Sequence, residues 1–276
     1  MKGKLYLCPT PIGNLEDVTL RVLRVLREAD LVAAEDTRHT RKLLSHYGIH
    51  TKLVSYHAHN QKKRGKELLQ RLKEGQKIAL VSDAGMPGIS DPGAELVRAA
   101  LEEGIEVEVL PGPSAVLTAL VASGLDTRRF VFEGFLPQSK RKRHLERLKE
   151  ETRTIVLFEA PHRLTCTLEE LESSLGGDRR VAVARELTKA HEEIFRGTLS
   201  EALQHFRAHP PKGEITIVVA GKGEEEEERA SPEEVLAEVE RLLAEGKAKR
   251  AAVKEAARRC GWSAREVYAL LVRRAT

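Results

Sequence analysis

The sequence predicts two α/β domains followed by a small C-terminal domain of helices in a helix-turn-helix-like arrangement. Three observations predict this class. Short apolar runs alternate with amphipathic helical stretches up to about residue 118, a second series of the same kind follows, and only helical patterns occur after residue 231. We place the N-terminal α/β domain at 1–123, the second α/β domain at 124–223, an acidic linker at 224–231 and a helical basic domain at 232–276.

The first domain has the pattern of successive βαβ units. Buried strands are expected at 5–8, 31–34, 77–81 and 107–110. Helices are expected at 20–27, from Thr40, which is a candidate N-cap, and at 94–101. Because the strands are separated by helices, we expect their sheet to be mostly parallel.

The second domain repeats this alternation. Its expected strands are 130–132, 154–158, 181–184 and 214–219. Its expected helices are 140–151, 162–175 and 199–208. The boundary between the two domains is expected near residues 124–129.

The C-terminal domain begins after an abrupt change of composition. Residues 221–223 lead into five consecutive glutamates, whose mutual repulsion favours a solvated hinge or a helix end. The run Ser-Pro-Glu-Glu at 231–234 is a helix start, with Ser as N-cap, Pro at the first position and Glu at the third. Residues 260–263 supply a Gly C-cap and a Ser N-cap between the last two helices, which predicts a helix-turn-helix.

Composition excludes several classes of protein. The 276 residues are 41% hydrophobic and 32% charged, which supports packed cores and excludes a disordered chain. No apolar run reaches the roughly 18 residues of a membrane span, and residues 1–6 lead into a strand rather than a secretory signal. The three cysteines, Cys8, Cys166 and Cys260, are far apart, so we expect a reducing cytoplasm and neither disulfides nor a cysteine zinc site. His57 and His59 have no carboxylate or cysteine at ligand spacing, so we expect no metal site.

Four groups of polar, glycine-rich or proline-rich segments follow predicted strands. In open α/β sheets the ligand crevice lies at the carboxyl ends of the strands, so these positions are the expected site. The groups are 9–17, then 82–93, then 111–115, and finally 158–163 together with 184–192 and 212–214. The first group has an alternative interpretation as an ordinary strand-to-helix turn without a function. The last group has an alternative interpretation as a solvated charged surface.

The loop at 82–93 gives the strongest signal for function. It holds three Gly and two Pro in twelve residues, whereas a strand-to-helix connection usually needs about 2–6 residues. Glycine lets the backbone approach a ligand closely. The loop matches neither the phosphate-binding G-K-[ST] ending nor G-x-G-x-x-G. Residues 111–115 end a strand and open a helix, so their free N–H groups can face a polar ligand.

Seven motifs in this order resemble the tetrapyrrole methylase superfamily, and within it the methyltransferases of small-subunit ribosomal RNA. They are 8–17, 35–38, 82–93, 111–115, 133–137, 159–163 and 185–189. Each motif alone is weakly specific. The ordered set is strongly specific, and the resemblance covers essentially the whole chain.

The resemblance implies an enzyme that uses S-adenosylmethionine (SAM), held in the cleft between two α/β domains, and usually a homodimer. It implies 2′-O-methylation of a cytidine ribose in the decoding region of 16S rRNA. The expected partner is therefore 16S rRNA or the small ribosomal subunit, with no membrane involved.

The resemblance also implies site residues. Contacts to SAM are expected from Ile12, Asp83, Met86, Ser114, Ala115, Phe158 and Glu214. Because a ribose hydroxyl is a poor nucleophile, in-line positioning and a proton-accepting group are expected. The candidates for this chemistry are Glu186, Lys189, His191 and Glu159. A lysine can act as a base only where burial or a neighbouring cation lowers its pKa.

Basic segments predict nucleic-acid binding. Residues 247–276 contain nine Lys or Arg against two Glu, a net charge of +7, and 140–143 and 62–66 are also basic. Such patches supply the salt-sensitive part of nucleic-acid affinity, although charged thermophile surface helices remain an alternative. Two other functions stay open. A small-molecule tetrapyrrole methyltransferase has no use for a basic tail, and a non-enzymatic helix-turn-helix regulator would bind duplex DNA without methyl transfer.

Overall fold

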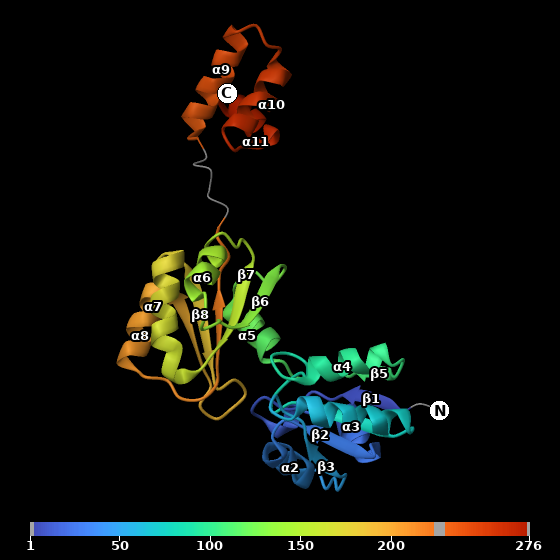
Figure 1. Cartoon of the computed structure of the whole chain (residues 1–276). Helices are drawn as coiled ribbons and strands as arrows, with labels where there is room; N and C mark the ends of the chain where they lie inside the picture. The colour runs from blue at the N-terminus through green and yellow to red at the C-terminus, as the bar shows by residue number, and fades with distance from the viewer. Residues whose placement is uncertain (1–2, 224–229, 275–276) are drawn as a thin grey trace. The chain divides into compact units, whose positions relative to one another are not determined.

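The computed structural model describes residues 3–223 and 230–274. Two compact units make up the chain, Met1–Gly221 and Lys222–Thr276 (Figure 1). Most of the predicted acidic linker, residues 224–229, lies outside the described residues. The predicted boundary between the two α/β domains falls inside the first unit and stays a prediction.

A parallel sheet forms the first half of the first unit. Its strands are β1 (Lys4–Leu7), β2 (Leu31–Ala34), β3 (Leu53–Ser55), β4 (Lys77–Val81) and β5 (Glu106–Val109). Their order across the sheet is β3-β2-β4-β1-β5, and every neighbouring pair is parallel. This confirms the mostly parallel sheet that the sequence predicts. The carboxyl ends of all five strands therefore meet at one edge.

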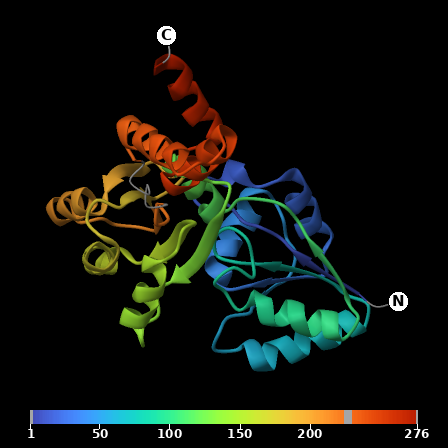
Figure 2. The same cartoon turned by 90° about the horizontal axis from the view of Figure 1, so that it is seen from above.

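Helices cover both faces of this sheet. They are α1 (Leu20–Glu28), α2 (Thr37–His46), α3 (Gln61–Lys73) and α4 (Gly93–Glu102). Because side chains alternate along a strand, Val32 and Ala34 pack with α1 and α2, whereas Leu31 and Ala33 pack with α3 and α4. The blue and the teal helices accordingly lie on opposite sides of the strands (Figure 2). Burial on both faces explains the uninterrupted apolar runs of β2 and β4.

Helix α2 begins earlier than the sequence predicts. Its N-cap is Asp36, whose carboxylate accepts a hydrogen bond of 2.8 Å from the backbone N–H of Arg38. Thr40 lies buried within the helix, so its prediction as the N-cap is wrong. A carboxylate at a helix N-terminus also interacts favourably with the helix dipole, which favours the earlier start.

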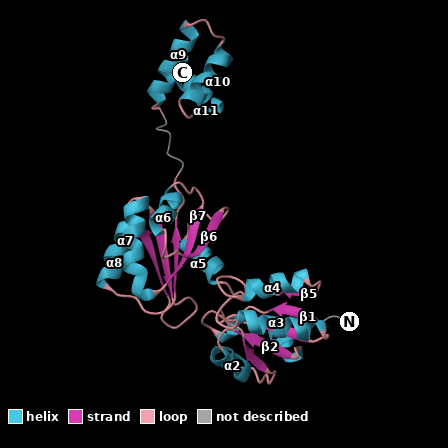
Figure 3. Cartoon of the chain, in the orientation of Figure 1, coloured by secondary structure: helices cyan, strands magenta, loops and turns pink. Residues whose placement is uncertain are grey.

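A mixed sheet forms the second half of the first unit. Its strands are β6 (Phe130–Phe135), β7 (Thr154–Glu159), β8 (Arg180–Arg185), β9 (Glu193–Thr198) and β10 (Ile215–Val219). The order is β6-β7-β10-β8-β9, with β6 and β7 parallel and the other three pairs antiparallel. Figure 3 draws the strands in magenta, with β6 and β7 labelled. Strand β9 follows β8 through a short turn rather than a helix, and this connection makes the pair antiparallel.

Helices also cover this second sheet. Helices α6 (Arg141–Lys149), α7 (Leu164–Leu175) and α8 (Leu199–Ala208) share one core with it. On the other face, α5 (Ala115–Ser123) packs through Val116, Ala119 and Leu120. Ile12, from the loop after β1, joins this same core. The two halves of the unit are thus tied together where the first sheet ends.

The second unit is a small bundle of helices with its own core. It contains α9 (Pro232–Ala244), α10 (Lys249–Arg259) and α11 (Ala264–Arg274), which pack around Val235, Val253 and Val267. The predicted capping box is present, because Ser231 and Glu234 each accept a hydrogen bond from the other's backbone N–H. The predicted α/β class with a helical C-terminus is confirmed. Among the described residues, none of the helices has the length and apolarity that a membrane span needs.

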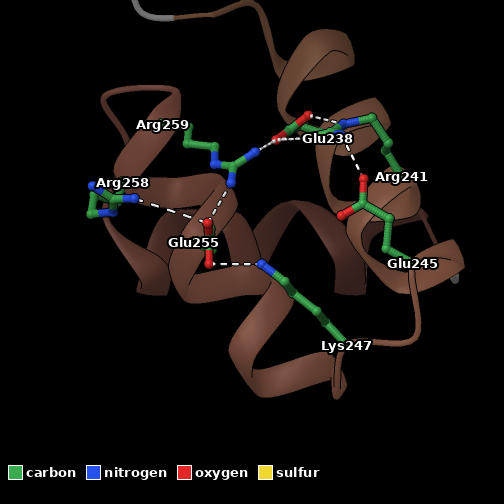
Figure 4. A network of polar contacts seen from close by, with 7 residues as sticks. All are labelled: Glu238, Arg241, Glu245, Lys247, Glu255, Arg258 and Arg259. Atoms are coloured by element: carbon green, nitrogen blue, oxygen red, sulfur yellow. Dashed lines mark hydrogen bonds and ion pairs between the residues drawn. The ribbon is translucent and has the colours of Figure 1, made fainter.

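Ion pairs neutralise part of the positive charge of this bundle (Figure 4). Glu238 binds Arg241 on its own helix at 2.8 Å and Arg259 of α10 at 2.9 Å, so it joins α9 to α10. Glu255 binds Arg259 and also Lys247. Within the described part of the bundle, the exposed cations without a carboxylate at ion-pair distance include Lys249, Arg250 and Lys254 of α10.

Candidate functional site

The loops after β1 and β4 are joined into one wall at the carboxyl edge of the first sheet. The backbone N–H of Thr10 donates to the carbonyl of Gly85, and the N–H of Gly85 donates to the carbonyl of Thr10, each at 2.9 Å. The Thr10 hydroxyl donates to the carbonyl of Ser82 at 3.1 Å. The first and second of the predicted loop groups therefore act as one structural element.

Asp91 organises the long loop after β4. Its carboxylate accepts hydrogen bonds from the N–H of Gly88 at 2.9 Å and from that of Gly93 at 2.7 Å. A Cβ on Gly93 would lie 2.7 Å from the Asp91 carboxylate, so only glycine fits there. The glycines of this loop thus serve a defined turn around one carboxylate.

A cleft of about 430 Å³, here called cleft one, lies between the two sheets of the first unit. It is lined by Ile12, Glu35, Ser82, Asp83, Ala84, Ile89, Ser90, Asp91, Ala115, Phe135, Phe158, Glu159, Ala160, Pro161, Gly213, Glu214, Ile215 and Thr216. Among these described residues, five carboxylates face apolar and aromatic walls, and there is no Lys, Arg or His. Such a cleft attracts a partly apolar cation.

The pKa values of two of these carboxyl groups reflect the crowding of negative charge. Burial raises the pKa of Glu35, and the nearby carboxylates of Asp83 and Asp91 raise it further. Burial also raises the pKa of Asp91, even though its backbone hydrogen bonds act in the opposite direction. A cation in cleft one would relieve this repulsion.

A second cleft, here called cleft two, encloses about 340 Å³ beside the first. It is lined by Thr10, Pro11, Ile12, Gly13, Leu15, His39, Thr40, Lys42, Leu43, Ser82, Asp83, Ala84, Lys189 and Glu214. The clefts share Ile12, Ser82, Asp83, Ala84 and Glu214. Cleft two differs in carrying three basic side chains, those of His39, Lys42 and Lys189. Two ligands can therefore meet across a common wall.

Lys189 connects the turn after β8 to the start of β10. Its Nζ donates to Glu186 Oε1 at 2.8 Å and to Glu214 Oε2 at 3.1 Å. Burial lowers the pKa of Lys189, but its bonds and charge interactions with both glutamates outweigh burial and leave the pKa raised. The hydrogen bond from Lys189 in turn lowers the pKa of Glu186. Lys189 therefore carries a positive charge, and the lowered pKa that a lysine base requires is absent.

Glu159 is buried in a network of its own at the wall of cleft one. It accepts hydrogen bonds from the Thr167 hydroxyl at 2.6 Å and from the backbone N–H of Ala160 at 2.8 Å. Arg141 donates to Thr167 at 2.7 Å and to Glu170 at 2.5 Å, and it lies 3.7 Å from Glu159. Arg141 is thus a largely buried residue that links Thr167, Glu170 and Glu159. The basic segment 140–143 suggests a surface cation at this position instead.

The structure brings most of the predicted SAM contacts together. Ile12, Asp83, Ala115, Phe158 and Glu214 line cleft one. Met86 and Ser114 do not line it, and the Ser114 hydroxyl instead caps α5 by accepting from the N–H of Leu117.

The four predicted candidates for proton transfer are more scattered. Glu159 lines cleft one and Lys189 lines cleft two. Glu186 and His191 line neither cleft. The sequence-based predictions do not single out Glu35 and Asp91, which line cleft one, or His39 and Lys42, which line cleft two. The polar residues directly after β2 are a sequence signal that could have identified Glu35.

Comparison with known proteins decides the family. The family model described as "Tetrapyrrole (Corrin/Porphyrin) Methylases" matches residues 4–203, more than half of the chain. The chain belongs to the tetrapyrrole methylase family.

Three curated relatives are similar over 80% or more of the chain. The "Ribosomal RNA small subunit methyltransferase I" of Synechocystis sp. is 51% identical over 97% of this chain and 97% of its own. The protein of the same name from Bacillus subtilis is 48% identical over 96% and 93%. That from Thermotoga maritima is 55% identical over 80% of this chain and 99% of its own.

Solved structures support the same family fold. The uroporphyrin-III-C-methyltransferase of Thermus thermophilus has a TM-score of 0.59 and 25% identity, over 79% of this chain and 94% of its own. A diphthine synthase has a TM-score of 0.62 at 16% identity, over 79% and 90%, which shows the fold alone.

Proposed function

We propose that this chain is a SAM-dependent methyltransferase that modifies the RNA of the small ribosomal subunit. One observation carries the proposal: the "Ribosomal RNA small subunit methyltransferase I" of Synechocystis sp. is 51% identical over 97% of both chains. S-adenosylmethionine is the methyl donor, and it supplies an electrophilic methyl group on a sulfonium ion when bound. The cytoplasm, where ribosomal subunits are made, is the proposed location.

The residues of cleft one fit this donor. SAM combines a flat adenine and a ribose with two positive charges, on the sulfonium and on the amino group. The cleft offers aromatic and aliphatic walls at Phe135, Phe158 and Ile215, with carboxylates at Glu35, Asp83 and Asp91 among the described lining residues. Ser114 supports the adjoining wall by capping α5.

The acceptor that we propose is the 2′-hydroxyl of a cytidine ribose in the decoding region of 16S rRNA, as the resemblance in sequence implies. Such a hydroxyl must lose its proton as it attacks. The carboxylates of Asp83 and Glu214 line both clefts, so they are placed to accept this proton. Lys189 remains cationic and holds Glu186 and Glu214 in position. Glu159, held by Thr167 and Ala160, shapes the wall of the donor cleft.

Two further features support the choice of an RNA substrate and of a homodimer. Arg250 and Lys254 lie four residues apart on the exposed face of α10, and neither has a carboxylate at ion-pair distance among the described residues, so their like charges repel unless an anion such as phosphate lies nearby. On α5, Leu117 is 53% exposed and Val121 is 72% exposed, and their spacing puts both on one side of the helix. We propose that a second copy of the chain covers this apolar side.

Methyl transfer from labelled SAM tests the proposed function directly. The protein is incubated with labelled SAM and small ribosomal subunits or 16S rRNA, and the labelled nucleotide is mapped. We expect label on one cytidine ribose, strongly reduced in Asp83→Asn and retained in Asp178→Asn, an exposed residue outside both clefts. Label confined to a porphyrin-like ring would overturn the RNA substrate. Absence of SAM binding would overturn the whole proposal.

A further inference from the structure

Charge is sorted between the two clefts. Within the described lining, cleft one contains five carboxylates and no basic side chain. Cleft two contains His39, Lys42 and Lys189, while its carboxylates, Asp83 and Glu214, belong to the wall that it shares with cleft one. In cleft two the two lysines balance the two carboxylates, whereas the carboxylates of cleft one face no basic side chain of its lining. Cleft two can therefore accept an anion that cleft one repels.

We propose that cleft two binds the sugar-phosphate backbone of the acceptor nucleotide, with Lys42 and His39 of α2 contacting its phosphate. This inference rests on the proposed function and identifies the surface that presents the RNA to the donor. A phosphodiester would be repelled by the carboxylates of cleft one, so the RNA must approach from the side of cleft two.

Lys42 is the available cation of this cleft. It is exposed and has no carboxylate within ion-pair distance among the described residues. Lys189, in contrast, is already paired with two glutamates. His39 keeps only a long contact of 3.9 Å to Asp36, because Arg38 occupies that carboxylate at 2.6 Å. An incoming phosphate would thus find Lys42 and His39 unengaged on one helix.

The floor of cleft two is fixed in place, as a positioning surface requires. A Cβ on Gly13 would lie 2.5 Å from Lys189 Cγ and 2.6 Å from the carbonyl oxygen of Leu187, so the loop after β1 rests directly on the turn after β8. Thr40 and Leu43 of α2 are buried beneath the same cleft. A ribose held here would lie against the wall shared with cleft one, where the methyl group arrives.

The test compares Lys42→Ala with Arg41→Ala in the full-length protein. Arg41 is the exposed neighbour on the same helix, carries the same charge and lies outside both clefts. Methyl transfer to small ribosomal subunits is measured at several salt concentrations, and SAM binding is measured by calorimetry. Loss of one charged hydrogen bond predicts that Lys42→Ala raises the KM for subunits about tenfold. The slope of log(kcat/KM) against the logarithm of the salt concentration should become shallower by about one, which is the change expected for one lost phosphate contact.

We expect Lys42→Arg to restore most of the subunit KM, and Lys42→Ala to leave the SAM dissociation constant unchanged. An unchanged subunit KM in Lys42→Ala, with the wild-type enzyme active on subunits, would overturn cleft two as the phosphate site and leave the proposed function standing. An equal effect in Arg41→Ala would assign the change to general surface charge and also overturn it. A wild-type protein that transfers no methyl group to subunits would refute the proposed function, and the inference with it.

Discussion

Lys189 lies between two carboxylates from different segments, and its raised pKa makes it a permanent cation at the edge of cleft two. Its removal would leave Glu186 and Glu214 facing each other without the cation that they share. The segment that carries Glu214 also contributes to cleft one, so a local disturbance reaches the wall where donor and acceptor meet.

We therefore expect Lys189→Met to lower kcat by about 10²-fold, the typical effect of displacing a reacting group by an ångström. The SAM dissociation constant should change less than kcat, because Lys189 does not line cleft one and acts on it only through Glu214. Lys189→Arg keeps the charge and should retain more activity. Steady-state kinetics with subunits, together with SAM calorimetry, measure both effects; wild-type kcat in Lys189→Met would contradict the assigned role.

Glu35 makes SAM binding depend on pH. Its pKa is raised by burial and by Asp83 and Asp91, so it becomes neutral at a higher pH than an ordinary glutamate does. Below that pKa the attraction for a cation is lost, and above it the attraction is complete. A bound cation lowers the pKa again, so binding should release protons at acidic pH.

The SAM affinity is therefore expected to rise with pH through the pKa of Glu35 and then to level off, by at most about tenfold per pH unit for each proton released. Calorimetry across a pH series measures this rise. Glu35→Gln should make the profile shallower but not flat, since Asp91 of the same cleft also has a raised pKa, whereas Glu102→Gln, an exposed residue of α4 outside both clefts, should leave it unchanged. A wild-type profile in Glu35→Gln would show that another group is responsible.

At the scale of elements, the start of β10 depends on one glycine. Gly213 has φ +88, and a Cβ there would lie 2.1 Å from Glu186 Oε1. Gly213→Ala must therefore displace Glu186 in addition to straining the backbone. Gly48→Ala is the matched control, since its φ is +61 and nothing lies within 4 Å of its Cβ position.

We expect Gly48→Ala to destabilise the protein by about 1–2 kcal/mol, the cost of a left-handed non-glycine residue. Gly213→Ala should cost about 1–3 kcal/mol more, the usual penalty of overpacking. Unfolding by denaturant, followed with the same probe for both variants, measures the difference. Equal losses would show that Glu186 relaxes freely and is not held by this turn.

The exposed side of α5 makes the dimer testable. Leu117→Glu and Val121→Glu place charges on the apolar side that we assign to a second copy, so each should shift the protein from dimer to monomer in sedimentation experiments. Leu101→Glu changes a leucine that is 58% exposed on α4 and should leave the dimer intact. A wild-type protein that sediments as a monomer would contradict the proposed homodimer.

The sequence predicts best the elements whose environment is uniform. Strands β2 and β4 are buried on both faces, so their apolar runs are unmistakable. Strand β3 has three half-buried residues, and β9 has only the adjacent pair Ile194 and Phe195 between Glu193 and Arg196, so neither gives a comparable signal. The loops at strand ends could likewise be found from the sequence. That His39 and Lys42 face a cleft could not, because this depends on how α2 packs on the sheet.

At the scale of the whole molecule, the methyltransferase fold and the basic bundle are separable. The family match ends at residue 203, inside the first unit. The Thermotoga maritima relative is covered over 99% of its length by 80% of this chain, so it lacks a counterpart for the remaining fifth. The bundle has its own hydrophobic core, built only from residues between 230 and 271 among those described. Each unit therefore buries its own apolar surface.

A protein shortened to residues 1–221 should therefore fold, bind SAM as the full chain does and keep its kcat. It loses the exposed cations Lys249, Arg250 and Lys254, so its KM for small subunits should rise and the salt dependence of kcat/KM should become shallower by up to about three. The full-length double variant Arg250→Glu/Lys254→Glu should reproduce much of this change with the bundle in place. Loss of SAM binding on truncation would show that the bundle completes the donor cleft. An unchanged KM would show that RNA affinity resides in the first unit, where Lys42 and the basic residues of α3 would then supply it.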